Sequence, residues 1–153
     1  MAALNTLEDI EEETAPGLIG KLAPKEIEMA SADKHPEVRS SALGVLSVIL
    51  DSANEQTADL TQALRDGIQD PNPEIRSAVL NLLEEMGEQA PVAPLAEMAL
   101  NDPSPGLRYA AVDALAGTGK KEVLPTLEKV ATDSNPRIRN RAKELILTMQ
   151  AKE

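Results

Sequence analysis

The 153-residue chain contains no cysteine, no tryptophan and no phenylalanine, and Tyr109 is its single tyrosine. Without cysteine it can form neither disulfides nor thiolate metal sites, which agrees with a reducing, cytoplasmic location. The acidic first residues lack the basic start and apolar run of a signal peptide. No run of about 18 apolar residues could cross a membrane. The core must therefore be built from Leu, Ile, Val, Ala and Met, which suits closely packed helices.

Positive charge is also scarce, because 15 Lys and Arg residues stand against 26 Asp and Glu residues, a net charge of −11. A protein that binds nucleic acid needs a positive surface that replaces counterions. We therefore expect neither nucleic acid nor an anionic membrane as a partner. The negative charge either serves solubility alone or attracts a basic partner surface.

Residue types that carry catalysis are few. His35 is the only histidine, so it cannot supply a paired-ligand metal site, and the absence of cysteine removes a thiol nucleophile. Gly117–Lys121 (GTGKK) resembles a phosphate-binding loop, but it lacks the earlier Gly and the Ser or Thr after Lys, and it would follow a helix instead of a strand. The sequence thus predicts no catalytic residue, no metal site and no cofactor.

One seven-residue motif, D-x-x-P-x-[V/I/L]-R, occurs four times. Its prolines are Pro36, Pro73, Pro105 and Pro136, and they are 37, 32 and 31 residues apart. A nearly fixed period of this size indicates stacked supersecondary units.

Each motif proline is expected to open a helix, because its missing N–H would be unpaired there and its φ is already helical. The predicted N-caps are the preceding residues His35, Asn72, Ser104 and Asn135. Apolar residues two, six and ten positions after each proline form one helical stripe. Gly87 and Gly117 should end the second and third of these helices. A second helix is expected before each proline, with Pro94 and Pro125 in the first turns of two of them.

These helical hairpins predict one all-α solenoid domain over residues 1–153, an α-α superhelix. Residues 1–32 should form an irregular N-terminal cap with a degenerate repeat, helical at about Leu4–Thr14 and Pro24–Ser31. The four repeats are 33–69, 70–101, 102–132 and 133–153, and Asp51–Thr57 replaces the glycine turn of the first. The last helix either ends in a soluble surface at Lys143 and Glu144 or continues the stack through self-association.

The Asp and Arg of each motif are interpreted as a structural ladder in which successive repeats bridge one another. Partly buried ion pairs of this kind fix register more reliably than they add stability. The ladder residues are Asp33, Arg39, Asp70, Arg76, Asp102, Arg108, Asp133 and Arg139. The alternative is that the four aspartates bind a cation or ligand, but a role repeated in every unit is usually structural.

The extended motif D-x-x-P-x-[V/I/L]-R-x-x-A, with a following A-L and a V-x-P-x-L-like second helix, resembles the HEAT repeat, and more narrowly the short phycobilisome-lyase-type HEAT repeat. Residues 101–142 show it most clearly, and the resemblance covers about residues 33–150. It implies an α-solenoid that binds other proteins. Some relatives act on bilins or phycobilisomes, so an accessory role in bilin processing is an alternative, as is a subunit of a larger scaffold. Relatives that hydroxylate need paired His-Glu ligands, which a single His cannot supply.

Partner binding is expected on the face formed by the second helices. Counted back eight and seven residues from each proline, this column contains Glu28, Met29, Arg65, Asp66, Glu97, Met98, Glu128 and Lys129. A mostly acidic column with two methionines would receive a basic or amphipathic segment of another protein, unless it is a plain solvated face. Tyr109 stands where other repeats carry Ser or Asn, so it is either a contact hot spot or lies flat on a neighbouring loop.

Overall fold

The computed structural model describes residue 29, residues 33–53 and residues 58–151, and the side chains of residue 29, residues 33–45 and residues 62–151. This part of the chain contains seven α-helices, two short 3-10 helices and no strand, so the predicted all-α fold class is confirmed. Glu28 and the predicted helical segments Leu4–Thr14 and Pro24–Ser31 fall outside these ranges, apart from the helical residue Met29.

The chain divides into two compact units, Met1–Ala63 and Leu64–Glu153. The first unit contains helix α3 (Pro36–Ala53) and the beginning of α4 (Ala58–Ile68). Helix α3 opens at its motif proline as predicted, but it continues through Asp51–Ala53, which the predicted turn Asp51–Thr57 placed outside the helix. Neither Gly nor Pro stands there to stop it. One domain over residues 1–153 stays a prediction.

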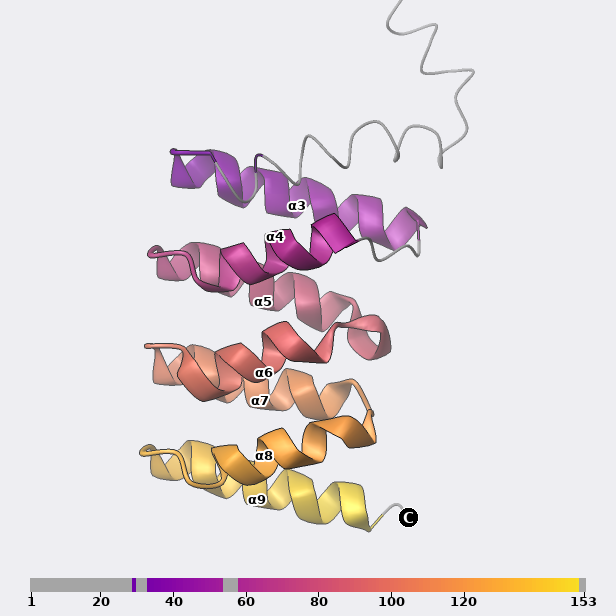
Figure 1. Cartoon of the computed structure of the whole chain (residues 1–153), viewed down its shortest axis with the longest axis vertical. Helices are drawn as coiled ribbons and strands as arrows, with labels where there is room; N and C mark the ends of the chain where they lie inside the picture. The colour runs from indigo at the N-terminus through magenta and orange to yellow at the C-terminus, as the bar shows by residue number, and fades with distance from the viewer. Residues whose placement is uncertain (1–28, 30–32, 54–57, 152–153) are drawn as a thin grey trace, which may run out of the picture. The chain divides into compact units, whose positions relative to one another are not determined.

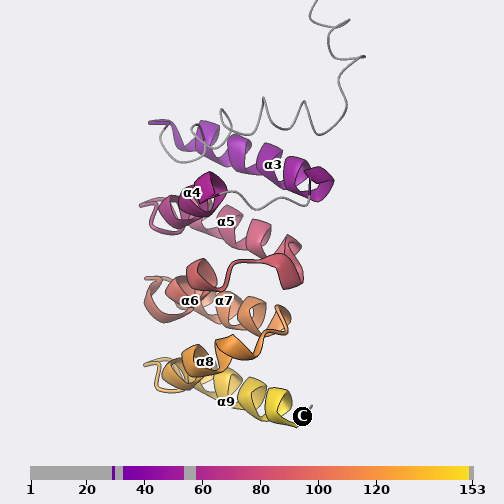
Figure 2. The same cartoon turned by 45° about the vertical axis from the view of Figure 1, so that its right-hand side comes forward.

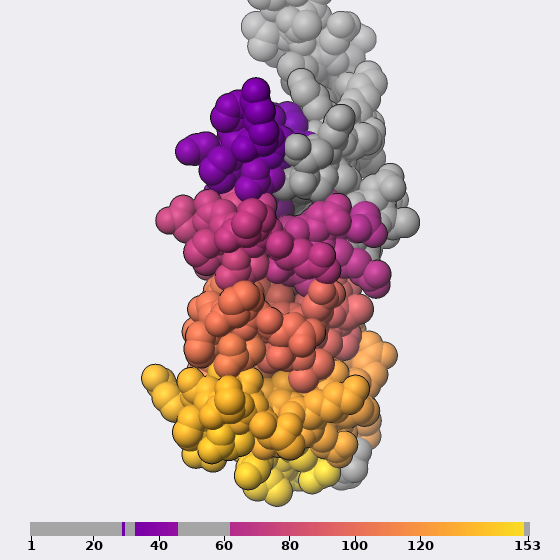
Figure 3. Space-filling model, turned by 60° about the vertical axis from the view of Figure 1, so that its left-hand side comes forward, coloured from indigo at the N-terminus to yellow at the C-terminus, as the bar shows by residue number. Residues whose placement is uncertain are grey.

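In the second unit the helices alternate between two rows (Figures 1 and 2). The first row consists of α5 (Pro73–Glu85), α7 (Pro105–Gly117) and α9 (Pro136–Gln150), and the second row consists of the end of α4, α6 (Val92–Asn101) and α8 (Leu124–Val130). Helix α7 packs against α5, α6 and α9, and α8 packs against α6 and α9. Figure 3 shows this unit as successive bands in direct contact. The stacked hairpins predicted from the motif period are therefore present.

The core between the rows is aliphatic and follows the predicted stripe. Ile75, Val79 and Leu83 lie two, six and ten residues after the proline that opens α5, and all three are buried. At the corresponding positions α7 buries Ala111 and Leu115 and half-buries Leu107, while α9 buries Ile138 and Ala142 and half-buries Ile146. The first-row helices therefore present one apolar face to the second row.

Helices α5 and α4 approach each other closely at Gly67. A Cβ atom added to Gly67 would lie 2.5 Å from Cγ2 of Val79. Non-bonded carbon atoms essentially never come so close, so a side chain at this position would force Val79 or the two helices to move. Gly67 lies outside the repeated motif, so the motif does not predict this close approach.

All four predicted N-cap residues directly precede their helices, and three of them cap with their side chains. Asn72 and Asn135 each accept through Oδ1 the backbone N–H two residues later at 2.9 Å, and Ser104 Oγ accepts the N–H of Leu107 at 3.4 Å. The carbonyl of His35 accepts the first N–H groups of α3, from Val38 and Arg39. Its side chain instead lies beside Asp33, with Nδ1 3.2 Å from Oδ1 of that carboxylate.

Both predicted glycine ends are confirmed, with different backbone geometry. Gly87 has a φ of 52° just after α5, in the 3-10 helix η1 (Gly87–Gln89). Gly117 is the last residue of α7, and the positive φ of 67° follows at Gly119. Between them the hydroxyl of Thr118 donates to the carbonyl of Leu115 at 2.7 Å. The 3-10 helix η2 (Lys121–Val123) then leads into α8.

Candidate protein-binding site

The loop before each first-row helix is held by the Asp and the Arg of its own motif. In all four motifs Oδ1 of the Asp accepts the backbone N–H two residues later at 2.7–2.8 Å, as in an Asx turn. Nη1 of the Arg donates to the carbonyl of the same Asp at 2.7–2.9 Å. The motif therefore builds one closed turn that presents the proline as the first helical residue.

The guanidinium also reaches the following repeat. Nε and Nη2 of Arg76 donate to Oδ2 and Oδ1 of Asp102 at 2.8 and 3.3 Å, and Arg108 binds Asp133 in the same way at 2.9 and 3.2 Å. The side chains of Arg76 and Asp102 are 9% and 0% exposed. These pairs, which we call the rungs, join neighbouring repeats by bidentate bonds out of solvent. The carboxylates of the four motif aspartates, which were candidate cation ligands, therefore already accept hydrogen bonds from the protein.

The rung between Arg108 and Asp133 also affects the ionisation of the Asp133 carboxylate. The hydrogen bond from Arg108 holds the pKa of Asp133 below its ordinary value, and the N–H of Asn135 lowers that pKa further. The pKa of Asp33 is lowered chiefly by its bond from the N–H of His35. Both carboxylates are therefore charged throughout the neutral range.

The last motif has the turn but not the rung. Nη1 of Arg139 donates to the carbonyls of Asp133 and Ser134 at 2.8 and 2.9 Å. Within the described ranges, no carboxylate accepts a bond from Nε of Arg139. Within the described residues, the motif that opens α9 therefore forms the closed turn but no rung.

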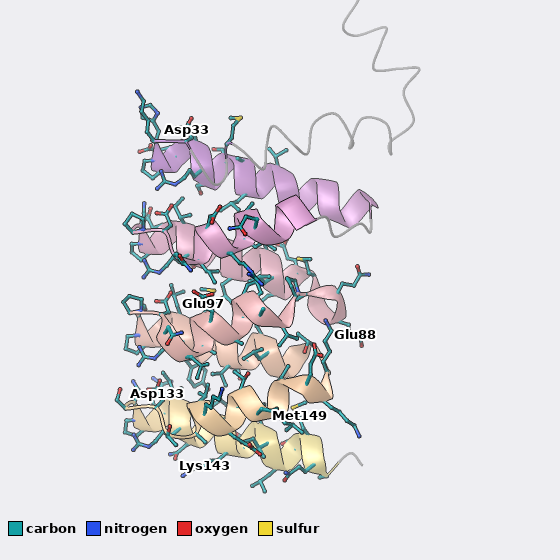
Figure 4. All side chains as sticks on the ribbon, in the orientation of Figure 1. Asp33, Glu88, Glu97, Asp133, Lys143 and Met149 are labelled. Carbon is teal, nitrogen blue, oxygen red and sulfur yellow. The ribbon has the colours of Figure 1, made fainter. Side chains whose placement is uncertain are left out.

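The outer side of α9 combines charge with one apolar side chain. Lys143 is exposed seven residues after the opening proline, where α5 and α7 bury Leu80 and Val112 (Figure 4). Leu147 is 67% exposed. A charged side chain at the position used for stacking opposes the addition of another apolar helix to this face.

The predicted partner-binding column is wrong at Met98, which is buried with 2% exposure, while Glu97 is half-buried. The reason is the helical register of α6. Its buried Leu95 lies ten residues before the motif proline, whereas Leu64 of α4 and Leu127 of α8 lie nine residues before theirs. Counting back from the proline therefore misplaces the α6 residues by one position, which is about 100° around a helix.

Alignment by the buried leucines Leu64, Leu95 and Leu127 corrects this register. Glu97 then corresponds to Asp66 on α4 and Lys129 on α8. The charged surface of the second row, which we call the second-row surface, consists of Arg65, Asp66, Glu97, Glu128 and Lys129. Three carboxylates and two cations make its charge mixed instead of mostly acidic. Of the two remaining residues of the predicted column, Met29 is half-buried and Glu28 lies outside the described residues.

Tyr109 lies against the next repeat. Its ring is half-buried, and the guanidinium carbon of Arg137 lies 5.6 Å from the ring centroid, a cation–π contact between α7 and the first turn of α9. The ring therefore has only part of its surface available to a partner.

A pocket of about 330 Å³ lies between the C-terminal ends of α4 and α6 and the two loops that follow them. Its apolar lining comes from Ile68, Pro71, Met98 and Pro103, and its polar lining comes from Gln69, Asp70, Arg76, Glu97, Asn101 and Asp102. Nε2 of Gln69 donates to Oε1 of Glu97 at 2.8 Å, and Figure 4 shows Glu97 on α6.

The sequence patterns pointed to Glu97, Met98, Arg76 and the two aspartates, but not to the pocket that they line together. Gln69 and Asn101 were also missed, because they stand next to the motif and not inside it. The usable signal was the pair of D-P dipeptides, Asp70-Pro71 and Asp102-Pro103, which occurs in only two of the four motifs.

Among the described residues, no three His, Asp or Glu side chains gather in a way that would hold a metal ion. None of the helices described is both long enough and apolar enough to cross a membrane.

Comparison with known families agrees with this architecture. The family model for HEAT repeats matches residues 23–116 and residues 92–146, which together include all four motifs. The match is to HEAT repeats in general and does not single out the phycobilisome-lyase type. No curated protein sequence matches the chain significantly. The stacked helical hairpins and the family match together show that the chain belongs to the HEAT-repeat family and has an α-solenoid fold.

Proposed function

We propose that this protein is a non-enzymatic scaffold or adaptor that binds another protein through its second-row surface. The observation that carries the proposal is the arrangement of α4, α6 and α8, each of which adds charged side chains to one surface. HEAT repeats commonly mediate protein–protein interaction, and stacked repeats provide extended surfaces for it.

The charge of the chain favours a basic or amphipathic segment as the partner. The net charge of −11 attracts a cationic segment over several ångströms, and this long-range attraction raises the association rate. The mixed charges of the second-row surface then favour one register of binding, because a shifted partner would place like charges opposite each other.

The remaining alternatives have less support. No observation on the described residues favours a role in bilin or phycobilisome processing, so we do not propose it. If the chain is a subunit of a larger scaffold, we expect it to bind its neighbours through the same second-row surface. Self-association through α9 is opposed by Lys143. A cytoplasmic location stays a prediction from the sequence.

Affinity capture tests the proposal. The full chain, tagged at one end, is used as bait in a lysate of its source, and bound proteins are identified by mass spectrometry. The binding variant carries Glu97→Lys and Glu128→Lys, and the control carries Glu88→Lys and Glu122→Lys, the same charge change on η1 and η2 (Figure 4 shows Glu88). Met98 is left intact because it is buried.

We expect wild type and control to retain the same protein, and the binding variant to lose it by about tenfold, which corresponds to about 1.4 kcal/mol. Thermal melts of all three proteins should agree within a few degrees, because three of the changed side chains are exposed and Glu97 is only half-buried. Equal capture by both variants would show that the partner uses another face.

A further inference from the structure

We infer that the pocket between α4 and α6 is a socket for one arginine side chain of the partner protein. The inference rests on the proposed function only for the source of that side chain, since arginine binding can be measured without any partner.

The shape of the pocket suits a long side chain with an aliphatic stem. Ile68 and Met98 are 5% and 2% exposed and form an apolar part of its lining. Pro71 and Pro103 add apolar atoms from the two loops. Arginine buries its methylene groups along such surfaces while its charged head stays among polar groups.

The charge of the pocket suits a cation. Asp70, Glu97 and Asp102 contribute three carboxylates, and Arg76 contributes one guanidinium, so the lining has a net formal charge of −2. Arg76 is already paired with Asp102 at 2.8 Å, which limits its repulsion of a second cation. A pocket between two helix ends also concentrates the field of its charges.

The acceptors of the pocket suit a guanidinium better than an ammonium group. Glu97 uses Oε1 for the bond from Gln69 and keeps Oε2 for a ligand, and the side-chain amides of Gln69 and Asn101 lie in the same lining. A guanidinium presents five N–H donors in one plane and can bind several separated acceptors together, whereas an ammonium group acts as a point charge. The rungs show that this fold already holds guanidinium groups by a carboxylate and loop carbonyls.

The acceptors are particular to the α4–α6 pair. With the repeats aligned by their buried leucines, the residue that corresponds to Glu97 on α8 is Lys129, and the residue that corresponds to Gln69 on α6 is Leu100. The next pair of second-row helices therefore has a cation and an apolar side chain where this pair has acceptors. That difference between repeats is what a specific contact requires.

The test is a titration of the ¹⁵N-labelled full chain with N-acetyl-arginine methylamide, followed by NMR. The side-chain amide signals of Gln69 and Asn101 report directly from the pocket. The citrulline analogue serves as the neutral ligand of similar shape, and the lysine analogue tests the preference for a guanidinium. The matched variants are Glu97→Gln in the pocket and Glu128→Gln, exposed on α8 and outside it.

We expect saturable shifts of both amide signals with a dissociation constant on the order of millimolar, as suits a ligand of this size. Glu97→Gln should weaken binding about fivefold or more, which is a typical loss for a hydrogen bond to a charged group, while Glu128→Gln leaves it unchanged. The inference is overturned if citrulline gives the same shifts, if Glu97→Gln binds as well as wild type, or if the lysine analogue binds more tightly than arginine.

The outcome of this titration is independent of the outcome of the capture experiment. Arginine binding that depends on Glu97, without any captured protein, would support the socket and contradict the scaffold. Capture that depends on the second-row surface, without arginine binding, would support the scaffold and overturn the socket.

Discussion

Helices α5 and α7 on one side and α9 on the other carry the same motif in different surroundings. In α5 and α7 the motif Arg reaches the Asp of the next repeat, and the residue seven positions after the proline is buried. In α9 the bonds of the Arg within the described residues go to its own loop, and that position holds the exposed Lys143. The turn, the N-cap and the helix start are nevertheless the same. The motif thus has two separable roles, a local turn and an interface between repeats.

The largest effect should come from removing a rung. Asp102→Ala leaves the buried guanidinium of Arg76 without its carboxylate and also removes the Asx turn. Breaking one partner of a buried ion pair costs about 3–5 kcal/mol. Arg139→Ala, which removes no rung, should cost less than about 1 kcal/mol. Chemical denaturation of the full chain measures both.

Asp102→Asn separates the two roles, because the Asn oxygen can still accept the N–H of Ser104 while the charge is lost. Its cost should fall between those of the other two variants. If Asp102→Asn were as stable as wild type, this rung would contribute nothing beyond the local turn, and α5 and α9 would not differ in the way described.

A second large effect is expected where α5 meets the second row. The methyl group of Gly67→Ala would collide with Val79, and overpacking of this kind costs about 1–3 kcal/mol. Gly44→Ala on α3 is the matched control, since nothing lies within 4 Å of its added Cβ, and it should stabilise its helix by about 1 kcal/mol. Thermal melts of the two variants should move in opposite directions. A stabilising Gly67→Ala would show that α4 and α5 can separate without loss.

The two roles of the motif also explain how much could be predicted from the sequence. The helix starts, three of the four caps and the apolar stripe depend on residues within about ten positions of each proline, so a local pattern predicts them. The ladder was predicted from recurrence alone, and the rungs Arg76–Asp102 and Arg108–Asp133 lie where the pattern places them.

The positions that depend on the spacing between a second-row helix and its motif proline were mispredicted. Leu95 lies ten residues before Pro105, whereas Leu64 and Leu127 lie nine residues before their prolines, so Met98 points inward and Glu97 is the counterpart of Lys129. The left-handed residue after α7 is Gly119, two residues beyond the glycine that ends the helix. The pocket needs both the α6 register and the stacking of two loops 32 residues apart, so the spacing of motifs alone could not predict it.

A smaller effect is expected from pH. The bond from Arg108 lowers the pKa of Asp133 in the folded protein, so its stabilisation is present above the unfolded pKa of about 3.9 and is lost as the pH falls through the lower folded value. Asp133→Asn should therefore destabilise most at neutral pH, and the difference from wild type should shrink below about pH 4. Urea unfolding at pH 7, 5, 4 and 3 measures this difference.

Glu84→Gln is the opposite control. Burial, and then the charge of Asp113, raise the pKa of Glu84, so ionised Glu84 opposes folding at neutral pH. The variant should be slightly more stable than wild type at pH 7, and this gain should disappear as the pH falls below the raised pKa. If both variants showed the same pH dependence, the Arg108 rung would not be the cause.

The smallest change in stability, but the most direct test of the comparison, comes from Lys143→Leu. It gives α9 the apolar residue that α5 and α7 bury at this position, beside the exposed Leu147. We expect this variant to associate at concentrations where wild type does not, while its unfolding free energy changes by less than about 0.5 kcal/mol. Light scattering after size exclusion measures the association. Lys129→Leu adds the same side chain on α8, so equal association of both variants would indicate general hydrophobic attraction. Association of Lys143→Leu alone would show that this lysine keeps the exposed face of α9 from stacking.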